Sequence, residues 1–274
     1  MNKTIFLINK KTRRIVKTIC GIKAFDNIII QKIFSFNKNS LTVVDKLPGI
    51  LVEYDYYSDI GQTLFFVGYF EENEIKFIIN TLRTEKEPVI MDIGANIGLH
   101  SIKWAKALGR SQIYAFEPAE RTRYILERNL SRNHLLNQIT VIPVAVSDKP
   151  GFASFFECED NAYSSLKDTR RKKIIQTEEV PVTTIDEFVK EKELKKISLI
   201  KIDVEGLEKE VIQGGLNTLQ SLRPDLFVEI YGGDSSNPDP EGTVKLIQSL
   251  GYQAFIMEQG KIIPYRRHDD SKYN

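Results

Sequence analysis

The feature that most constrains the fold is a regular alternation, from about residue 87 onward, of short apolar runs with longer segments of helical periodicity. Strands that alternate with helices are typical of a parallel sheet whose connections cross over as helices. The sequence therefore predicts an α/β fold with a Rossmann-like, doubly wound, mostly parallel sheet. Its seven expected strands are residues 88–92, 112–116, 139–145, 199–203, 226–230, 252–257 and 261–264.

Residues 150–184 interrupt this alternation. Strand-like runs at 151–157 and 179–184 flank a polar, basic loop at 167–173, where a plain helix would otherwise stand. We expect this insertion to shape the substrate entrance.

The chain divides into three parts. We expect an N-terminal arm and small hairpin at 1–59, the main domain at 60–264 and a flexible tail at 265–274. The arm is expected to hold a short helix and a hairpin at 41–57, and a helix at about 72–83 leads into the sheet.

Residues 1–39 carry nine Lys and Arg side chains against one acid, Asp26. A basic segment rich in Ile and Phe can make peripheral contact with an anionic membrane surface. The alternative is a solvated extension that packs against the domain.

Composition limits the function classes. The chain is 42% apolar and 27% charged, as in globular proteins with a substantial core, and its net charge of +1 gives no reason to expect a nucleic acid partner. Cys20 and Cys158 offer neither a disulfide framework nor metal-ligand spacing, which favours a reducing, cytoplasmic location. No apolar run approaches the ~20 residues of a membrane span. The oligomeric state is not predicted.

The strongest local motif is Asp92-Ile-Gly94-Ala-Asn96-Ile-Gly98, between an expected strand and a helix. Gly94 and Gly98 permit a sharp turn and a close approach of ligand, and the helix N-terminus adds unpaired N–H groups. A dinucleotide fingerprint reads Gly-x-Gly-x-x-Gly, whereas this spacing is Gly-x-x-x-Gly. The pattern favours a nucleoside ligand with an amino-acid tail and no pyrophosphate. The alternative is a glycine-rich turn that serves packing alone.

Glu117 ends the next expected strand, 25 residues after Asp92, and Pro118 follows it. A carboxylate at this place can accept both ribose hydroxyls of a nucleoside bound over the first turn. The alternative is an exposed loop acid or a charge at a helix N-terminus.

Further acids follow the fourth strand and lie within the fifth, at Asp203, Glu205 and Glu229. A carboxylate in an apolar run is costly unless it is paired or liganded. Because these strand ends flank the same crevice as the first strand, the acids are predicted to surround the reactive end of the ligand. Alternatives are that Asp203 holds amides of its own turn and that Glu205 caps the next helix.

Several segments, which follow one another in a fixed order over roughly residues 60–258, resemble the motifs of the FkbM-type methyltransferases. The segments are Ile60–Glu71, Val89-Ile-Met-Asp-Ile-Gly-Ala-Asn-Ile-Gly98, Phe116-Glu-Pro118, Val144-Ala-Val-Ser-Asp148, Val182-Thr-Thr-Ile-Asp186, Ile200-Lys-Ile-Asp-Val-Glu-Gly-Leu-Glu208 and Phe227-Val-Glu229.

The resemblance implies a Rossmann-like methyltransferase fold, S-adenosylmethionine as donor, and usually O-methylation of a sugar, glycolipid or small natural product. It also implies an adenine contact near residues 145–147. The expected cofactor-binding residues are Asp92, Gly94, Ala95, Asn96, Gly98, Glu117, Pro118, Ala145, Val146 and Ser147.

A hydroxyl acceptor needs a base, because a protonated hydroxyl is a poor nucleophile. Asp203 or Glu229 could serve, or the two could hold a divalent metal ion that lowers the hydroxyl pKa. His100 is a third candidate, and its alternative is a packed residue of the first helical turn. Two rival functions are a nicotinamide-dependent oxidoreductase and a catalytically silent binding module that keeps the cofactor fold.

Overall fold

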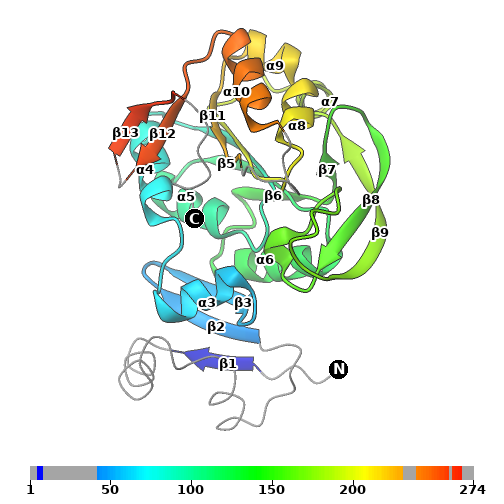
Figure 1. Ribbon diagram of the computed structural model, residues 1–274. Coiled ribbons are helices and arrows are strands. Elements are labelled where there is room, and N and C mark those ends of the chain that lie inside the picture. Colours follow the sequence, from blue (N-terminus) through cyan, green and yellow to red (C-terminus); the bar gives the residue numbers. More distant parts are fainter. Residues whose placement is uncertain (1–4, 9–41, 231–238, 259–260, 267–274) are drawn as a thin grey trace.

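The structure is a computed structural model that describes residues 5–8, 42–230, 239–258 and 261–266 (Figure 1). At its centre is a parallel sheet of five strands in the order β11-β10-β4-β5-β6. These strands are β4 (Val89–Ile93), β5 (Gln112–Phe116), β6 (Ile139–Ile142), β10 (Leu199–Ile202) and β11 (Asp225–Val228).

The strand order reverses at β4. The chain runs outward from β4 through β5 to β6, and then returns to the other side of β4 as β10 and β11. In open α/β sheets, ligands bind at the carboxyl ends of the strands where the order reverses. The topology therefore places the crevice between the ends of β4, β5 and β10, as the sequence predicted.

Helices cover both faces of the sheet. Alternate residues of a strand point to opposite faces, so Ile90 belongs to one hydrophobic layer and Met91 to the other. The layer that contains Ile90 also contains residues of the N-terminal hairpin and of α4 (Glu72–Leu82), α5 (Leu99–Leu108) and α6 (Glu120–Arg132). The opposite layer contains residues of α7 (Ile185–Glu191), α8 (Glu208–Gln213), α9 (Leu216–Ser221) and α10 (Pro240–Ser249).

The N-terminal hairpin is part of this core. Strands β2 (Thr42–Leu47) and β3 (Ile50–Asp55) pair antiparallel, which confirms the hairpin expected at 41–57. Its Val43, Val52 and Tyr54 are fully buried in the layer around Ile90. Helix α3 (Asp59–Phe66) then leads to α4, at the place predicted for a helix.

The expected helix of the N-terminal arm is not found at Ile5–Ile8. These residues form strand β1, which pairs parallel with β2. The rest of the basic segment 1–39 lies outside the described residues, so its contact with a membrane surface stays a prediction. No helix within the described ranges is long and apolar enough to cross a membrane.

The insertion forms a second sheet of its own. Strands β8 (Gly151–Cys158) and β9 (Ile174–Thr183) pair antiparallel, and β7 (Ala145–Val146) joins β9 in parallel. The strand expected at 139–145 is therefore divided between two sheets. Pro143 lacks a backbone N–H group, and the pairing of β6 with the central sheet ends just before it.

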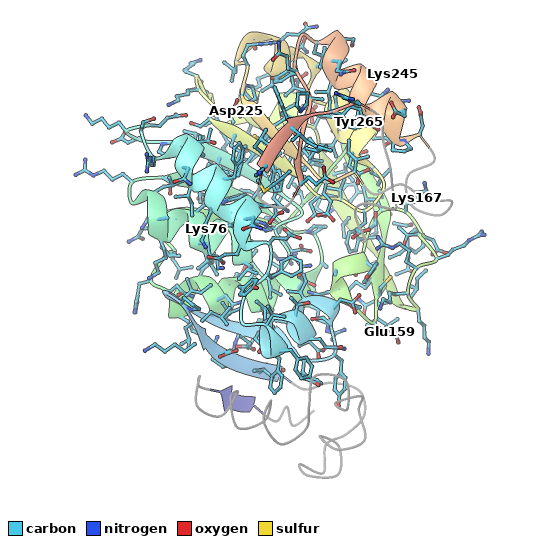
Figure 2. The ribbon with its side chains drawn as sticks, turned by 60° about the vertical axis from the view of Figure 1, so that its left-hand side comes forward. Lys76, Glu159, Lys167, Asp225, Lys245 and Tyr265 are labelled. Atoms are coloured by element: carbon cyan, nitrogen blue, oxygen red, sulfur yellow. The ribbon has the colours of Figure 1, made fainter. Side chains whose placement is uncertain are left out.

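The prediction of seven central strands is not confirmed, because five are found in the central sheet. The two C-terminal runs, β12 (Phe255–Glu258) and β13 (Lys261–Pro264), pair antiparallel with each other in a separate two-stranded sheet. The Tyr265 hydroxyl donates to Glu241 Oε1 of α10 at 2.8 Å, so this hairpin lies beside α10 (Figure 2). A short apolar run specifies a strand, but its partner is chosen by the packing around it.

Candidate active site

The turn after β4 adopts the conformation that its glycines permit. Gly94 and Gly98 have φ angles of 80° and 85°, and Asn96 between them is also left-handed at 51°. The N–H groups of Gly94 and Ala95 both donate to the Phe116 carbonyl, at 3.2 and 2.9 Å. A Cβ on Gly94 would lie 1.8 Å from the Asp203 carbonyl oxygen, so this turn packs backbone to backbone against the end of β10.

Glu117 reaches this turn directly. Its Oε2 accepts from the Asn96 N–H and its Oε1 from the Ala119 N–H, both at 3.0 Å. The side chain is buried, and burial raises the pKa of Glu117 to about 7, although the two N–H bonds lower it. The sequence prediction that the glycine turn and this acid share one crevice is confirmed.

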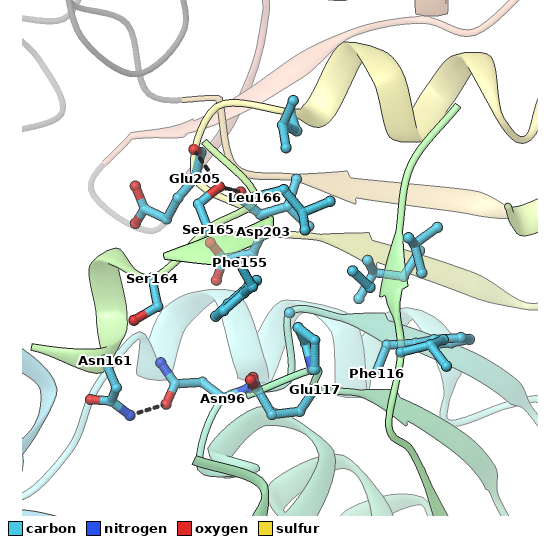
Figure 3. A pocket seen from close by; sticks show the side chains of 18 of the residues that line it. Asn96, Phe116, Glu117, Phe155, Asn161, Ser164, Ser165, Leu166, Asp203 and Glu205 are labelled. Carbon is cyan, nitrogen blue, oxygen red and sulfur yellow. Dashed lines mark hydrogen bonds between the residues drawn. The ribbon is translucent and has the colours of Figure 1, made fainter. Parts of the chain in front are cut away.

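A pocket opens between these elements, with about 620 Å³ of space that is partly open to solvent (Figure 3). The predicted site residues that line this pocket are Gly94, Asn96, Glu117, Pro118, Ala145, Val146 and Asp203. Phe155, Asn161, Ser164, Ser165 and Leu166 of the insertion complete its wall.

Four predicted cofactor residues do not line the pocket. Asp92 is fully buried, and its Oδ2 accepts from the Ser101 hydroxyl at 2.6 Å. Ala95 is also buried, and Gly98 faces Leu126 of α6. Ser147 binds through its N–H to the Thr183 carbonyl at 3.0 Å. These residues shape the turn or the wall of the pocket.

Lys201 lies directly beside the pocket-lining residues Asp203 and Gly94, and the sequence motifs gave it no role. It is 2% exposed, and its Nζ lies 3.0 Å from Asp203 Oδ2, 3.4 Å from Asp92 Oδ1 and 3.3 Å from the Gly94 carbonyl oxygen. Burial alone would lower the pKa of Lys201, but the nearby carboxylates of Asp203 and Asp92 outweigh it and raise the pKa. Like Glu229, Lys201 is a charge inside an apolar run, which is costly unless the charge is paired.

Glu71 is a second missed residue. It stands at the N-cap of α4 with a left-handed φ of 46°, and its side chain makes no cap hydrogen bond. Its Oε2 lies instead 2.9 Å from Nε2 of His100, a buried residue of α5. Burial would raise the pKa of Glu71, but the contact with His100 outweighs this and lowers it. The left-handed residue is strained, as functional residues often are.

Acids crowd the ends of β10 and β11. The pKa of Glu229 is raised well above its usual range. Repulsion from Asp203 is the main cause, and burial is the second. The pKa of Glu205 is raised to about 8. Burial is the largest cause and repulsion from Asp203 the next, whereas Arg171 lowers the pKa. The N-cap of α8 is Leu207, so the alternative that Glu205 caps this helix is wrong.

The insertion contacts the glycine turn and the segment after β10 at the edge of the pocket. The Asn161 amide donates to Asn96 Oδ1 at 2.5 Å (Figure 3), and the Ser165 hydroxyl donates to the Val204 carbonyl at 2.9 Å. Arg171 pairs with Glu205 at 2.5 Å. The expected role of the insertion at the substrate entrance is consistent with this position.

The described residues contain no group of three or more His, Cys, Asp or Glu side chains placed to hold a metal ion. The alternative that Asp203 and Glu229 together hold a divalent ion stays a prediction, as do Asp203, Glu229 and His100 as candidates for the base.

Comparison with known proteins decides the family. A family model described as the Methyltransferase FkbM domain matches residues 92–254, from the glycine turn to the start of the C-terminal hairpin. The chain belongs to the FkbM methyltransferase family. As the sequence motifs implied, it is an S-adenosylmethionine-dependent methyltransferase.

Three relatives illustrate the range of the family. Hexuronic acid methyltransferase AglP of Haloferax volcanii is 32% identical over 182 residues, or 65% of this chain and 67% of that protein. Methyltransferase sdnD of Sordaria araneosa is 26% identical over 66% of this chain and 82% of its own. 2-O-methyltransferase NoeI of Sinorhizobium fredii is 28% identical over 53% of this chain and 64% of its own.

The buried ammonium of Lys201 predicts a large stability effect. Lys201→Met leaves the fully buried Asp92 and its neighbour Asp203 without their cation, which should lower the free energy of unfolding by about 3–5 kcal/mol. Lys196→Met is the control, because Lys196 pairs with Glu85 at the surface and should cost at most about 1 kcal/mol. Urea denaturation measures both, and equal losses would contradict this account.

The raised pKa of Glu117 predicts a pH-dependent affinity. An ionised carboxylate is the stronger acceptor for ribose hydroxyls, and Glu117 ionises as the pH rises through about 7. The affinity for S-adenosylmethionine should therefore rise by up to about tenfold between about pH 6 and 8. Isothermal titration calorimetry measures it. Glu117→Gln is the control, since it should bind more weakly at every pH and lose this rise. A flat wild-type profile would contradict the prediction.

Proposed function

We propose that this chain transfers a methyl group from S-adenosylmethionine to a hydroxyl oxygen of a sugar, a glycolipid or another small natural product. The observation that carries the proposal is the joining of the glycine turn to Glu117 by the 3.0 Å bond from the Asn96 N–H. Asn96 and Glu117 both line the pocket in which we expect the nucleoside and its amino-acid tail to bind.

The residues present fit S-adenosylmethionine. The N–H groups at the start of α5 suit the carboxylate of the amino-acid tail, because a helix N-terminus attracts negative charge. Glu117 suits the ribose, and the apolar Phe116, Ala145 and Val146 suit the adenine. The Asp203 carboxylate lines the pocket and suits the positive sulfonium.

The names of two relatives support an oxygen acceptor on a sugar. AglP is named for hexuronic acid, and NoeI is named a 2-O-methyltransferase. A sugar hydroxyl would lie against the far side of the pocket, where Asp203 and Glu205 meet the insertion.

Bound S-adenosylmethionine supplies an electrophilic methyl group. The new oxygen–carbon bond forms as the carbon–sulfur bond breaks, sulfur keeps the electron pair, and the hydroxyl proton passes to a base. Asp203 lines the pocket, whereas Glu229 and His100 lie outside its lining. Glu229 adjoins Asp203, and repulsion from Asp203 is the main cause of its raised pKa. Orientation of the acceptor supplies much of the rate.

Ligand binding tests the proposed function. S-adenosylmethionine at about 100 times its Kd should stabilise the protein by about 2.7 kcal/mol, seen as a rise in Tm. NAD and NADP at the same concentration should leave the Tm unchanged, because the turn lacks the dinucleotide spacing. A shift with NAD alone would favour the oxidoreductase alternative. No shift with S-adenosylmethionine would contradict the proposal.

Substitution of Asp203 tests the chemistry. A donor labelled on its methyl group, incubated with a panel of glycans, glycolipids and small alcohols, identifies the acceptor by mass spectrometry. With that acceptor, Asp203→Asn should lower turnover at least about 100-fold if Asp203 takes the proton. The Kd for S-adenosylmethionine is measured separately. Unchanged turnover would eliminate Asp203, and the same assays on Glu229→Gln and His100→Asn then discriminate the other two candidates.

A further inference from the structure

We propose that Asn129 of α6 is a positioning residue that fixes the cofactor turn by clamping it to the N-terminal hairpin. The affinity for S-adenosylmethionine then depends on a strand that lies outside the matched family domain. The inference rests on the proposed cofactor site, and it identifies a residue for which the sequence motifs gave no role.

Asn129 joins two distant segments through one carboxamide. It is fully buried, and its Nδ2 donates to the Ile97 carbonyl at 2.9 Å and to the Glu53 carbonyl at 3.0 Å. Its Oδ1 accepts from the Glu53 N–H at 2.6 Å. Both hydrogens of the Asn129 amide nitrogen are therefore donated in hydrogen bonds. Ile97 lies within the glycine turn, between Asn96 and Gly98.

Helix α6 also touches this turn at a second point. A Cβ on Gly98 would lie 2.3 Å from Cδ1 of Leu126, so the Leu126 side chain already fills that space. Leu126 and Asn129 are three residues apart and share one face of the helix. That face therefore contacts the turn through an apolar and a polar side chain.

The hairpin end of the clamp is also fixed. Strand β3 pairs with β2 on one edge, and its other edge is bound by asparagine side chains of α6. Asn133 binds the N–H of Leu51 at 3.0 Å and its carbonyl at 2.6 Å. The Glu53 carboxylate pairs with Arg128 at 2.9 Å and Arg132 at 2.7 Å. Figure 1 shows α6 between this hairpin and the central sheet.

The position of Ile97 matters for the cofactor. Its neighbour Asn96 is left-handed, donates its N–H to Glu117 and lines the pocket with its side chain. A strained backbone of this kind persists only where surrounding contacts hold it. The bond from Asn129 to the Ile97 carbonyl is such a contact.

Two matched substitutions test the clamp. Asn129→Asp and Asn133→Asp keep side-chain size, and each removes two hydrogen bonds donated to backbone carbonyls. Only Asn129→Asp removes the bond to the cofactor turn. Both should lower the Tm of the ligand-free protein. Asn129→Asp should also raise the Kd for S-adenosylmethionine about tenfold, whereas Asn133→Asp should change it less than about twofold.

The readout is calorimetric binding of S-adenosylmethionine well below the Tm of each variant, so no acceptor is needed. If Asn129→Asp does not fold, Asn129→Ala against Asn133→Ala repeats the comparison without an added charge. If the wild type binds S-adenosylmethionine and the two variants have equal Kd values, the clamp is contradicted and the proposed function is not. A wild type that fails to bind contradicts the proposed function and the clamp together.

Discussion

The buried ammonium of Lys201 is the interaction on which the site depends. It lies between Asp92 at the end of β4 and Asp203 at the end of β10, and it also reaches the Gly94 carbonyl. An unpaired charge at this depth would be costly, so the lysine and the two carboxylates require one another. Because β4 and β10 are neighbours where the strand order reverses, this pairing holds together the two strand ends that open the crevice.

The glycine turn is the point at which four parts of the chain meet. Asp203 packs its carbonyl against Gly94, Glu117 binds the Asn96 N–H, and Asn161 of the insertion binds the Asn96 side chain. Helix α6 holds the turn from behind through Asn129. Each contact uses a different atom of a short segment, so the turn is fixed before any ligand enters. Such preorganisation lowers the entropy lost on binding.

The acidic side chains near the pocket lie close to one another, although their charges repel. Their mutual repulsion and burial raise the pKa values of Glu205 and Glu229, and Arg171 and Lys201 offset part of the effect. A carboxyl group whose pKa lies nearer to neutrality is a better proton acceptor at the pH where it works.

The sequence by itself determined the α/β class, the glycine turn, the pairing of that turn with Glu117 and the placement of Asp203 at the pocket. These follow from local periodicity and from the rule that the carboxyl ends of parallel strands share one edge. Only the tertiary structure decided the five-stranded central sheet, the separate β12–β13 hairpin, and the contacts of Lys201, Glu71 and Asn129. Strand partners and buried ion pairs depend on which segments meet in space, and residue spacing along the chain does not encode that meeting.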